Sequence, residues 1–394
     1  MNLLLVPTSD WIHHPTKSRL HHIFERLARR HTVNVLWFRQ ARWGAPPRKT
    51  HAKLFEATSI PARDLSAYYL LNTSAHLNKI ESIIRNEHID VIVFANILAG
   101  STAVISGAKH HIPVVCDYLD HYAESAGSYY SNKAIAALVT FAVSSITRWN
   151  VENSSFVVTI SESFKDILVN EYHVAPERIT MIPNGVDPRR FTSMGRDIAQ
   201  RTLGLERFKN SLCVCYAGAV ESWSNLEAVS RVIQRLNEEG KEVALFVVGG
   251  SLGTSYYHQL RTKFERRECF LFTGFVNETL VPIYISAADI CILPSHVSRI
   301  SAGLPLKLLE YLACKRPVVC TPIPEVEKAL KGIVTLYAND LELESLLREI
   351  CEGKRSLQKS VDRGYMFAQS RSWEHLSELY ENVLLKLVSS AVSV

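Results

Sequence analysis

The sequence lacks the features that mark several specialised protein classes. Its eight cysteines show no Cys-x-x-Cys spacing, and most of them lie within apolar runs, as small buried side chains do. We therefore expect a reducing, cytosolic environment. No Gly-x-Gly-x-x-Gly follows the first predicted strand, which argues against a Rossmann dehydrogenase. The adjacent histidine pairs at 13–14, 21–22 and 110–111 suit a single metal ion poorly, because neighbouring side chains point to different sides of an element.

Long apolar runs are also missing. The N-terminus has no basic region ahead of its short apolar stretch, so it does not resemble a signal peptide. The uncharged stretch at residues 134–147 is interrupted by Thr140, Ser144 and Ser145 and falls short of the roughly 20 apolar residues of a membrane span. We expect a cytoplasmic protein that is soluble or attached only peripherally, on the inner face of the membrane.

Charge of one sign is not in large excess, since the net charge of +5 is too small to imply nucleic-acid binding by itself. The first 50 residues are nevertheless locally basic, with only Asp10 and Glu25 as acids. This segment favours an anionic substrate or an anionic membrane face, although a solvated basic surface would have the same composition. Its basic residues are Lys17, Arg19, Arg26, Arg29, Arg30, Arg39, Arg42, Arg48 and Lys49.

The 394 residues, 47% of them hydrophobic and 21% charged, have the composition of a soluble globular protein with two or three domains. Short β-branched runs alternate with helical patterns along the chain. This alternation predicts βαβ units and parallel sheets buried on both faces. The predicted strands lie at 3–6, 33–38, 91–94, 114–116 and 156–160, and then at 213–216, 244–248, 290–293 and 318–320.

A polar stretch at 188–210 contains no strand candidate and separates the two series of strands. We place the domain boundary there, with a first domain over 1–200 and a second over 205–371. Each series is long enough for its own doubly wound sheet, so the predicted fold class is α/β with two Rossmann-like domains facing across a cleft. Ligands of such sheets bind outside the carboxyl ends of the strands, which directs attention to the strand-to-helix loops.

The segment 301–319 is the most informative of these loops. Gly303 and Pro305 open a helix whose free N–H groups and dipole form an anion site, and Lys307 in its first turn adds a cation. Glu310 follows roughly 7.5 Å along the axis, about one sugar away from a bound diphosphate. A carboxylate there could accept hydrogen bonds from a ribose hydroxyl pair. The alternative is an ordinary helix start followed by a solvated or ion-paired glutamate.

Several strings then carry a family resemblance. GLPLKLLEYLACKRPVV resembles the nucleotide-sugar-binding segment of family 4 retaining glycosyltransferases of GT-B fold, and MIPNGVDPRRF resembles the signature that ends their N-terminal domain. VVTISESFKDIL, YAGAVE, FTGFV and AADICILPS are similar to further segments of that family. They occur in the family's order and cover most of the chain, with the weakest match between residues 40 and 85.

The resemblance implies roles for residues of the second domain. Glu310 would hold the ribose hydroxyls, and the backbone around Gly303 and Leu304 would cradle the diphosphate. Gly218 and Ala219 would lie beside the diphosphate in the first loop of this domain.

Two further loops would approach the nucleotide. Phe275 and Val276 would lie near the base. Gly249 and Gly250 would let the chain turn sharply near the nucleotide, or they are plain turn glycines.

The chain departs from the family pattern in two places. Many members have a second glutamate eight positions before Glu310, where this chain has Ala302. The family also usually places an Arg and a Lys in the loop after YAG, whereas residues 218–225 of this chain contain neither. Arg299 and Lys307 flank the anion site and are the substitutes that we expect. The alternative is a donor site that has decayed.

In the first domain, Asp117, Asp120 and His121 follow or end a predicted strand, where many relatives carry a His-Asp pair. The resemblance implies that they orient the sugar or take the acceptor proton, Asp120 above all. Capping of the next helix is an equal alternative for Asp120. Arg19 and His22 resemble an Arg-x-His-His element of one branch of the family, or they form the wet face of the first helix.

No Asp-x-Asp pair occurs, so the metal-holding motif of the other large glycosyltransferase fold is missing. We expect a transfer that needs no metal and no cofactor besides the nucleoside diphosphate sugar. A helix dipole and fixed cations would stabilise the leaving diphosphate. The resemblance implies retention of anomeric configuration, a glycan or lipid-linked acceptor, and a final helix at 372–394 that returns to the first domain.

Two alternatives to a hexosyltransferase remain at this point. A nucleotide-sugar epimerase of the same fold also has two Rossmann-like domains, although the MIPNGVD string counts against it. A nucleotide-sugar-binding protein without catalysis would account for Ala302 and for the loop at Ala219.

Overall fold

The computed structural model describes residues 1–8, 10–14, 16–39, 47–57, 60–62, 65–127, 130, 132–251, 254–295 and 303–392. Two compact units divide the chain, one formed by Met1–Pro183 with Trp373–Val394 and the other by Asn184–Ser372. Two of the residues that bear on the predicted anion site, Arg299 and Ala302, lie outside the described ranges.

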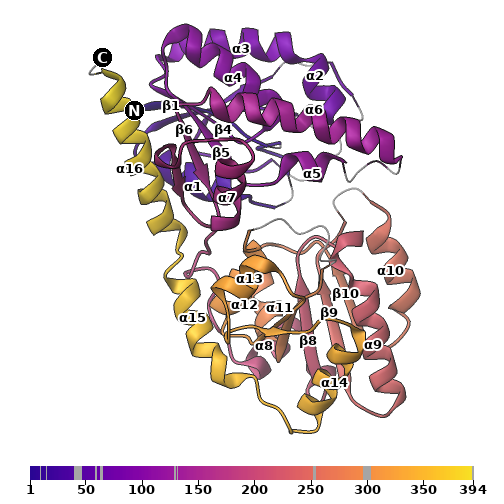
Figure 1. Cartoon of the computed structure of the whole chain (residues 1–394). Helices are drawn as coiled ribbons and strands as arrows, with labels where there is room; N and C mark the ends of the chain where they lie inside the picture. Colours follow the sequence, from indigo (N-terminus) through magenta and orange to yellow (C-terminus); the bar gives the residue numbers. More distant parts are fainter. Residues whose placement is uncertain are drawn as a thin grey trace. The chain divides into compact units, whose positions relative to one another are not determined.

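The first unit is built on a parallel sheet of seven strands in the order β3-β2-β1-β4-β5-β6-β7 (Figure 1). The residues of β1 from Leu3 to Val6 are all fully buried, as expected for a central strand covered on both faces. The strands are β1 (Asn2–Val6), β2 (Thr32–Trp37), β3 (Lys53–Glu56), β4 (Val91–Phe94), β5 (Val114–Tyr118), β6 (Phe156–Thr159) and β7 (Ile179–Met181).

Helices follow most strands of the first unit and cover the sheet. They are α1 (Arg19–Leu27), α2 (Leu65–Leu71), α3 (Thr73–Glu87), α4 (Ile97–His110), α5 (Tyr122–Gly127), α6 (Lys133–Glu152) and α7 (Glu162–Asn170), with α16 (Trp373–Val392) added from the end of the chain.

The last helix, α16, packs along α1 (Figure 1). The Tyr380 ring meets the Phe24 ring edge-on with centroids 5.3 Å apart. Ion pairs at the rim join Arg26 to Glu374 at 3.2 Å and Arg30 to Glu381 at 2.9 Å. Two cations of the basic first segment are therefore already paired with acids of α16, which makes this part of the segment a weaker anionic-surface ligand than its composition suggests.

The second unit has a parallel sheet of six strands in the order β10-β9-β8-β11-β12-β13, the 3-2-1-4-5-6 order of a Rossmann fold. The strands are β8 (Leu212–Ala217), β9 (Val243–Val248), β10 (Phe270–Gly274), β11 (Ile290–Leu293), β12 (Val318–Cys320) and β13 (Thr335–Leu336). The helices are α8 (Arg196–Leu203), α9 (Leu226–Glu238), α10 (Tyr256–Phe264), α11 (Val281–Ser286), α12 (Leu306–Ala313), α13 (Pro324–Ala329), α14 (Asp340–Cys351) and α15 (Val361–Gln369).

Strand β8 explains how both faces of this sheet become buried. Cys213, Cys215 and Ala217 belong to the hydrophobic cluster on one face, whereas Val214 and Tyr216 belong to the cluster on the other. Alternation places successive side chains on opposite faces, and helices cover both. The α/β class with two Rossmann-like sheets, predicted from the sequence, is confirmed.

The division between the units lies earlier than the sequence interpretation placed it. Residues 184–200, assigned there to the first domain, belong to the second unit. Phe191 and Ala199 are buried in its core, and Gln200 Nε2 donates to Ala287 O at 3.0 Å. The chain therefore leaves the first unit after Pro183. The polar stretch at 188–210, predicted to be the boundary, lies within the second unit. The polar composition of this stretch hid the few apolar side chains that anchor it.

Candidate active site

Three loops meet at the carboxyl edge of the second sheet. Gly218, directly after β8, donates its N–H to Val248 O at 2.9 Å, and Val220 N–H donates to Gly250 O at 3.0 Å. Gly249 N–H, directly after β9, donates to Gly274 O at 3.0 Å. The three loops that follow β8, β9 and β10 are thus joined by backbone hydrogen bonds. This is the edge where ligands of doubly wound sheets bind.

Gly249 is the residue that allows this close approach. Its φ of +131° is strained for any residue with a side chain, and a Cβ placed there would lie 2.1 Å from Gly218 O. We expect Gly249→Ala to lower the free energy of unfolding by about 2 kcal/mol or more, because strain of about 1–3 kcal/mol adds to a backbone clash. Urea unfolding measures the change.

Gly353→Ala is the matched control for Gly249→Ala. Gly353 also has positive φ, +69°, but nothing lies within 4 Å of its added Cβ. The expected loss is about 1 kcal/mol, the cost of the left-handed conformation alone. Equal losses for the two variants would contradict a packing requirement at Gly249.

Helix α12 begins at the same edge. Pro305 precedes it in extended conformation, so the helix starts with its first N–H groups unpaired within the helix. Gly303 and Leu304 are buried, and Asn184 Nδ2 donates to Leu304 O at 2.9 Å. Tyr311 Oη accepts from Ala217 N at 2.8 Å and donates to Ala217 O at 3.1 Å. The two bonds of Tyr311 fix α12 against the end of β8, and the bond of Asn184 holds the backbone just before the helix.

Lys307 points from the first turn of α12 towards the loop after β8. Its Nζ donates to Tyr216 Oη at 2.7 Å and lies 4.4 Å from the Tyr216 ring centroid and 5.1 Å from that of Trp223. A Cβ on Gly218 would come within 2.9 Å of this ammonium group. Burial lowers the pKa of Lys307 to about 8, while the charge of Glu310 opposes that change. The structure therefore brings together a cation, an α-helix N-terminus and a glycine loop.

Glu310 lies one turn further along α12. Its side chain is only partly buried, and no hydrogen-bond partner of its carboxylate occurs in the described part of the chain. Burial raises the pKa of Glu310 to about 7, and the charges of Arg190 and Lys307 counteract this rise. A carboxylate with unused acceptor capacity beside an anion site can receive hydrogen bonds from neutral hydroxyls.

Arg190 and Asn184 are site residues that the sequence interpretation did not assign. Arg190 donates to Glu278 O at 2.8 Å and forms an ion pair with the Glu278 carboxylate at 3.3 Å, besides its effect on Glu310. Both residues lie within the MIPNGVDPRRF string. From the sequence, that string predicts only the end of the first domain, and nothing in it indicates that Asn184 and Arg190 bind within the second unit.

The loop after β8, which lacks the Arg and Lys usual in the family, is held in place by hydrogen bonds to Glu221. The Glu221 carboxylate accepts hydrogen bonds from Ser251 Oγ at 2.9 Å and from Thr254 Oγ1 at 2.6 Å. This carboxylate ties the loop after β8 to the loop after β9. Ala219 contributes its carbonyl, which accepts from Tyr216 Oη. Among the cations of the described ranges, Lys307 is the one that contacts this loop beside Gly218.

The predicted base-side residues lie at the end of β10. Phe275 is 52% exposed, and its ring lies over Gly250, where an added Cβ would be 2.9 Å away. Val276 is partly buried and packs against the core of the unit. Phe275 therefore exposes its aromatic ring beside the loops that follow β8, β9 and β10. Such a position suits a residue that contacts the planar ring of a base.

The predicted residues of the first unit separate into a buried pair and a more exposed pair. Asp117, within β5, is fully buried, and Arg19 Nε lies 3.5 Å from its Oδ2. Burial raises the pKa of Asp117, and Arg19 opposes this rise. Arg19 also donates to Pro183 O at 2.7 Å. Arg19 and Asp117 therefore form an internal ion pair, and Arg19 also ties α1 to the end of the unit. The roles that the resemblance implies for these two residues stay predictions.

Asp120 and His121 are partly exposed just beyond the carboxyl end of β5. The loop is held by Tyr122 Oη, which donates to Ala95 O at the end of β4. His22 stacks on Trp373 with ring centroids 4.9 Å apart and an interplanar angle of 3°. Asp120 and His121 therefore lie at the edge of the sheet where ligands of such folds bind, and their predicted role stays a prediction. His22 packs on the first residue of α16.

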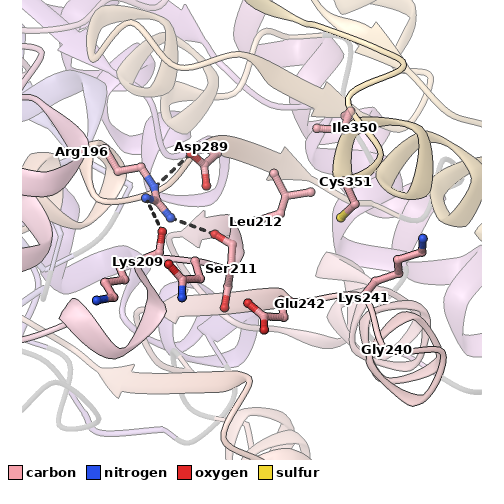
Figure 2. Close-up of a pocket in the computed structure, with 11 residues that line it drawn as sticks. Arg196, Lys209, Ser211, Leu212, Gly240, Lys241, Glu242, Asp289, Ile350 and Cys351 are labelled. Atoms are coloured by element: carbon pink, nitrogen blue, oxygen red, sulfur yellow. Dashed lines mark hydrogen bonds and ion pairs between the residues drawn. The ribbon is translucent and has the colours of Figure 1, made fainter.

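A pocket of about 460 Å³ lies at the opposite edge of the second sheet. Leu212 and Asp289, which line it, stand at or just before the first residues of β8 and β11. Figure 2 shows Arg196 turned towards Asp289 and towards the carbonyls of Lys209 and Ser211, with distances of 3.0, 3.0 and 2.8 Å. Arg196 is occupied by these partners, so we assign the pocket a structural role.

Comparison with known proteins identifies the family of the chain. A family model described as "Glycosyltransferase Family 4" matches residues 17–190, and one described as "Glycosyl transferases group 1" matches residues 212–352. An uncharacterised glycosyltransferase of Methanocaldococcus jannaschii is 23% identical over 66% of this chain and 63% of its own length.

Two further proteins extend the comparison. The UDP-Gal:alpha-D-GlcNAc-diphosphoundecaprenol alpha-1,3-galactosyltransferase of Escherichia coli is 24% identical over 64% of this chain. Its match again spans 63% of the relative, so both relatives are covered over less than two thirds of their length. The crystal structure of Anabaena HepE with UDP and glucose superposes with a TM-score of 0.73 at 17% identity, covering 98% of this chain and 99% of that one.

Together the two family models cover most of both units, and the solved structure shares the whole fold. The chain belongs to glycosyltransferase family 4 and has the two Rossmann-like domains of the GT-B fold.

Proposed function

We propose that this chain transfers a hexosyl group from a nucleoside diphosphate sugar to a glycan or lipid-linked acceptor, with retention of anomeric configuration and without a metal ion. The observation that carries the proposal is the carboxylate of Glu310, which has no hydrogen-bond partner among the described residues and lies one turn beyond Lys307 on a helix that starts at the carboxyl edge of the second sheet. HepE binds UDP and glucose, and the E. coli relative acts on a diphosphoundecaprenol-linked sugar. Both support the proposed substrate classes.

In the proposed site, the N–H groups at the start of α12 and the Lys307 ammonium hold the diphosphate. Negative charge grows on this diphosphate as the glycosidic bond breaks, so fixed donors there stabilise the transition state more than the ground state. The sugar passes through an oxocarbenium-like state. Glu310 fixes the ribose, and Phe275 lies beside the base.

A screen of uridine, guanosine, adenosine and thymidine diphosphate sugars by thermal shift tests the donor half of the proposal. We expect one nucleotide series to raise the melting temperature, and the matching sugar nucleotide to be consumed in the presence of a lipid-linked acceptor. The rate should be unchanged by EDTA, and NMR should show the donor's anomeric configuration in the product. A transfer rate that EDTA abolishes and Mg²⁺ restores would refute the proposal that the transfer needs no metal ion.

A nucleotide-sugar-binding protein without turnover is the second candidate, because Glu221 stands in the loop where the family has cations. Stabilisation by a sugar nucleotide without its consumption would favour that candidate. Nothing in the comparisons supports the epimerase alternative.

Asp120 is the proposed catalytic or sugar-orienting residue of the first unit, with His121 beside it. We expect Asp120→Asn to lower kcat by roughly 10²- to 10⁴-fold, the usual contribution of a positioned acid or base, while donor affinity stays the same. Asp166→Asn, at an exposed position of α7, is the control and should leave kcat unchanged. A kcat for Asp120→Asn within twofold of the parent would remove Asp120 from the mechanism.

Binding of a nucleoside diphosphate should depend on pH with two limbs. The pKa of Glu310 is raised to about 7, so affinity should fall below that pH as the carboxylate gains a proton and can no longer accept two hydroxyl bonds. The pKa of Lys307 is lowered to about 8, so affinity should also fall above that pH as the ammonium loses its charge. Calorimetric titrations between pH 6 and 9 should find the tightest binding between these values. In Glu310→Gln the acidic limb should vanish and the basic limb remain.

A further inference from the structure

Helix α6 of the first unit buries two polar side chains and exposes large apolar ones. Its buried side chains are Val143, Thr147, Asn150 and Val151, and the polar groups of Thr147 and Asn150 bond inside the unit. Thr147 Oγ1 donates to Val143 O at 2.7 Å, and Asn150 Nδ2 donates to Ile97 O in α4 at 2.7 Å. A surface helix in water usually turns its polar residues outward and its apolar residues to the core. In α6 hydroxyl and amide side chains face the protein instead.

Large apolar side chains occupy the outer face of the same helix. The exposed fractions are 47% for Ile135, 67% for Leu138, 72% for Phe141 and 41% for Trp149. At 100° per residue, Leu138, Phe141 and Trp149 fall on one stripe, and Ala134, Ala142 and Ser145 complete it with small residues. The exposed stripe therefore extends over about four turns without a strongly polar side chain until Glu152 at the end of the helix.

Composition alone would let α6 cross a bilayer, and it is the one described helix of which this is true. The helix has 20 residues, about 30 Å in length. It packs, however, against α5 and α4, as Figure 1 shows for the first unit. An apolar helix held along one side by protein and open along the other is placed to lie at a membrane surface.

We propose that the outer face of α6 inserts into the headgroup–acyl boundary of an anionic phospholipid bilayer and docks the first unit there. The charges on the helix fit this partner, because the first 19 residues carry Lys133 and Arg148 and no acid. Both cations are exposed, and at 100° per residue they lie on the same side of the apolar stripe. This surface uses no residue of the proposed donor site, so it can be tested without the transfer reaction.

The size of the stripe favours a bilayer over a second copy of the chain. The four large side chains together expose on the order of 400–500 Å² of apolar surface. A stable protein interface typically buries about 800 Å² on each partner. A narrow, convex stripe of that area suits shallow insertion between lipids better than a flat interface between two proteins.

Flotation of the full chain with vesicles tests the proposal. We expect the protein to float with phosphatidylethanolamine–phosphatidylglycerol (3:1) vesicles and to stay bound in 0.5 M NaCl, because apolar insertion is not screened by salt. The double variant Leu138→Gln/Phe141→Gln should float at least tenfold less. Its melting temperature should be unchanged, because both side chains are mostly exposed. Ile198→Gln/Met366→Gln, which alters exposed apolar residues of the second unit, is the matched control and should float like the parent.

Three results would overturn the proposal. The parent chain could fail to float, or the double variant could float as well as the parent. Release at 0.5 M NaCl would instead assign the binding to exposed cations such as those of the basic first segment. Sedimentation velocity adds an independent check: a dimer that the double variant dissociates would assign the stripe to a second copy of the chain.

Discussion

Glu310→Gln is expected to weaken nucleoside diphosphate binding by roughly 30- to 150-fold. The carboxylate would accept two hydrogen bonds from ribose hydroxyls, and the amide can accept through only one oxygen and without charge. Bonds to a charged partner contribute about 1.5–3 kcal/mol each, so a combined loss of about 2–3 kcal/mol is a reasonable expectation. Isothermal titration with the nucleoside diphosphate found in the thermal-shift screen measures this loss.

The same variant should not destabilise the free protein. The folded-state pKa of Glu310 lies above its ordinary value of 4.5, so the ionised carboxylate opposes folding at neutral and higher pH. The neutral amide removes that opposition, and the melting temperature at pH 8 should stay the same or rise. Glu238→Gln, at an exposed position near the end of α9, is the control and should change neither affinity nor stability. Unchanged affinity in Glu310→Gln would remove Glu310 from the site.

Lys307→Ala should weaken the binding of the nucleoside diphosphate much more than the binding of the nucleoside. The variant removes the cation beside Gly218, and a charged hydrogen bond of about 1.5–3 kcal/mol predicts a loss of roughly 10- to 150-fold for the nucleoside diphosphate. The nucleoside, which has no phosphate, should lose less than twofold. Competition titrations with both ligands measure the two changes in one experiment.

The control for Lys307→Ala is Lys263→Ala, because Lys263 is a surface lysine of the same unit, ion-paired to Glu227 at 2.7 Å. It should leave both affinities unchanged. Equal losses for nucleoside and nucleoside diphosphate in Lys307→Ala would indicate a collapsed loop instead of a missing phosphate contact. In that case the packing of Lys307 on Tyr216 and Trp223 would be its role.

The interior strands of both sheets were predictable from the sequence, and the edge strands were not. All nine predicted runs are strands in the structure, namely β1, β2, β4, β5, β6, β8, β9, β11 and β12. The sequence did not predict β3, β7, β10 and β13. Those four are the outer strands of the two sheets. An interior parallel strand is buried on both faces and reads as a continuous apolar run, but an edge strand is half-exposed and does not. β3, with Lys53 and Glu56 exposed, shows the difference.

Within the site, short-range features were predictable and long-range partners were not. The spacing of Gly303, Lys307 and Glu310 on one helix can be read directly from a 3.6-residue period. The contacts of Asn184 with Leu304 and of Tyr311 with Ala217 join residues 120 and 94 positions apart. No local pattern specifies such pairs, because they depend on how the loops are brought together by the sheet.

Charged residues of the first unit illustrate a second limit. Asp117 and Arg19 carry the residue types of a catalytic site, and the structure places them in contact with each other inside the unit. Sequence alone does not distinguish a buried ion pair from two exposed functional groups, because burial is set by the tertiary packing of α1 and α16 around β5. Asp120, three residues beyond Asp117, stays partly exposed.

A crystal structure of the full chain with a bound nucleoside diphosphate tests the central claim most directly. The account predicts the β-phosphate within hydrogen-bond distance of the N–H groups at the start of α12 and of Lys307 Nζ, with both ribose hydroxyls on the Glu310 carboxylate. A nucleotide bound at any other edge of the second sheet, with Glu310 free of it, would contradict the account.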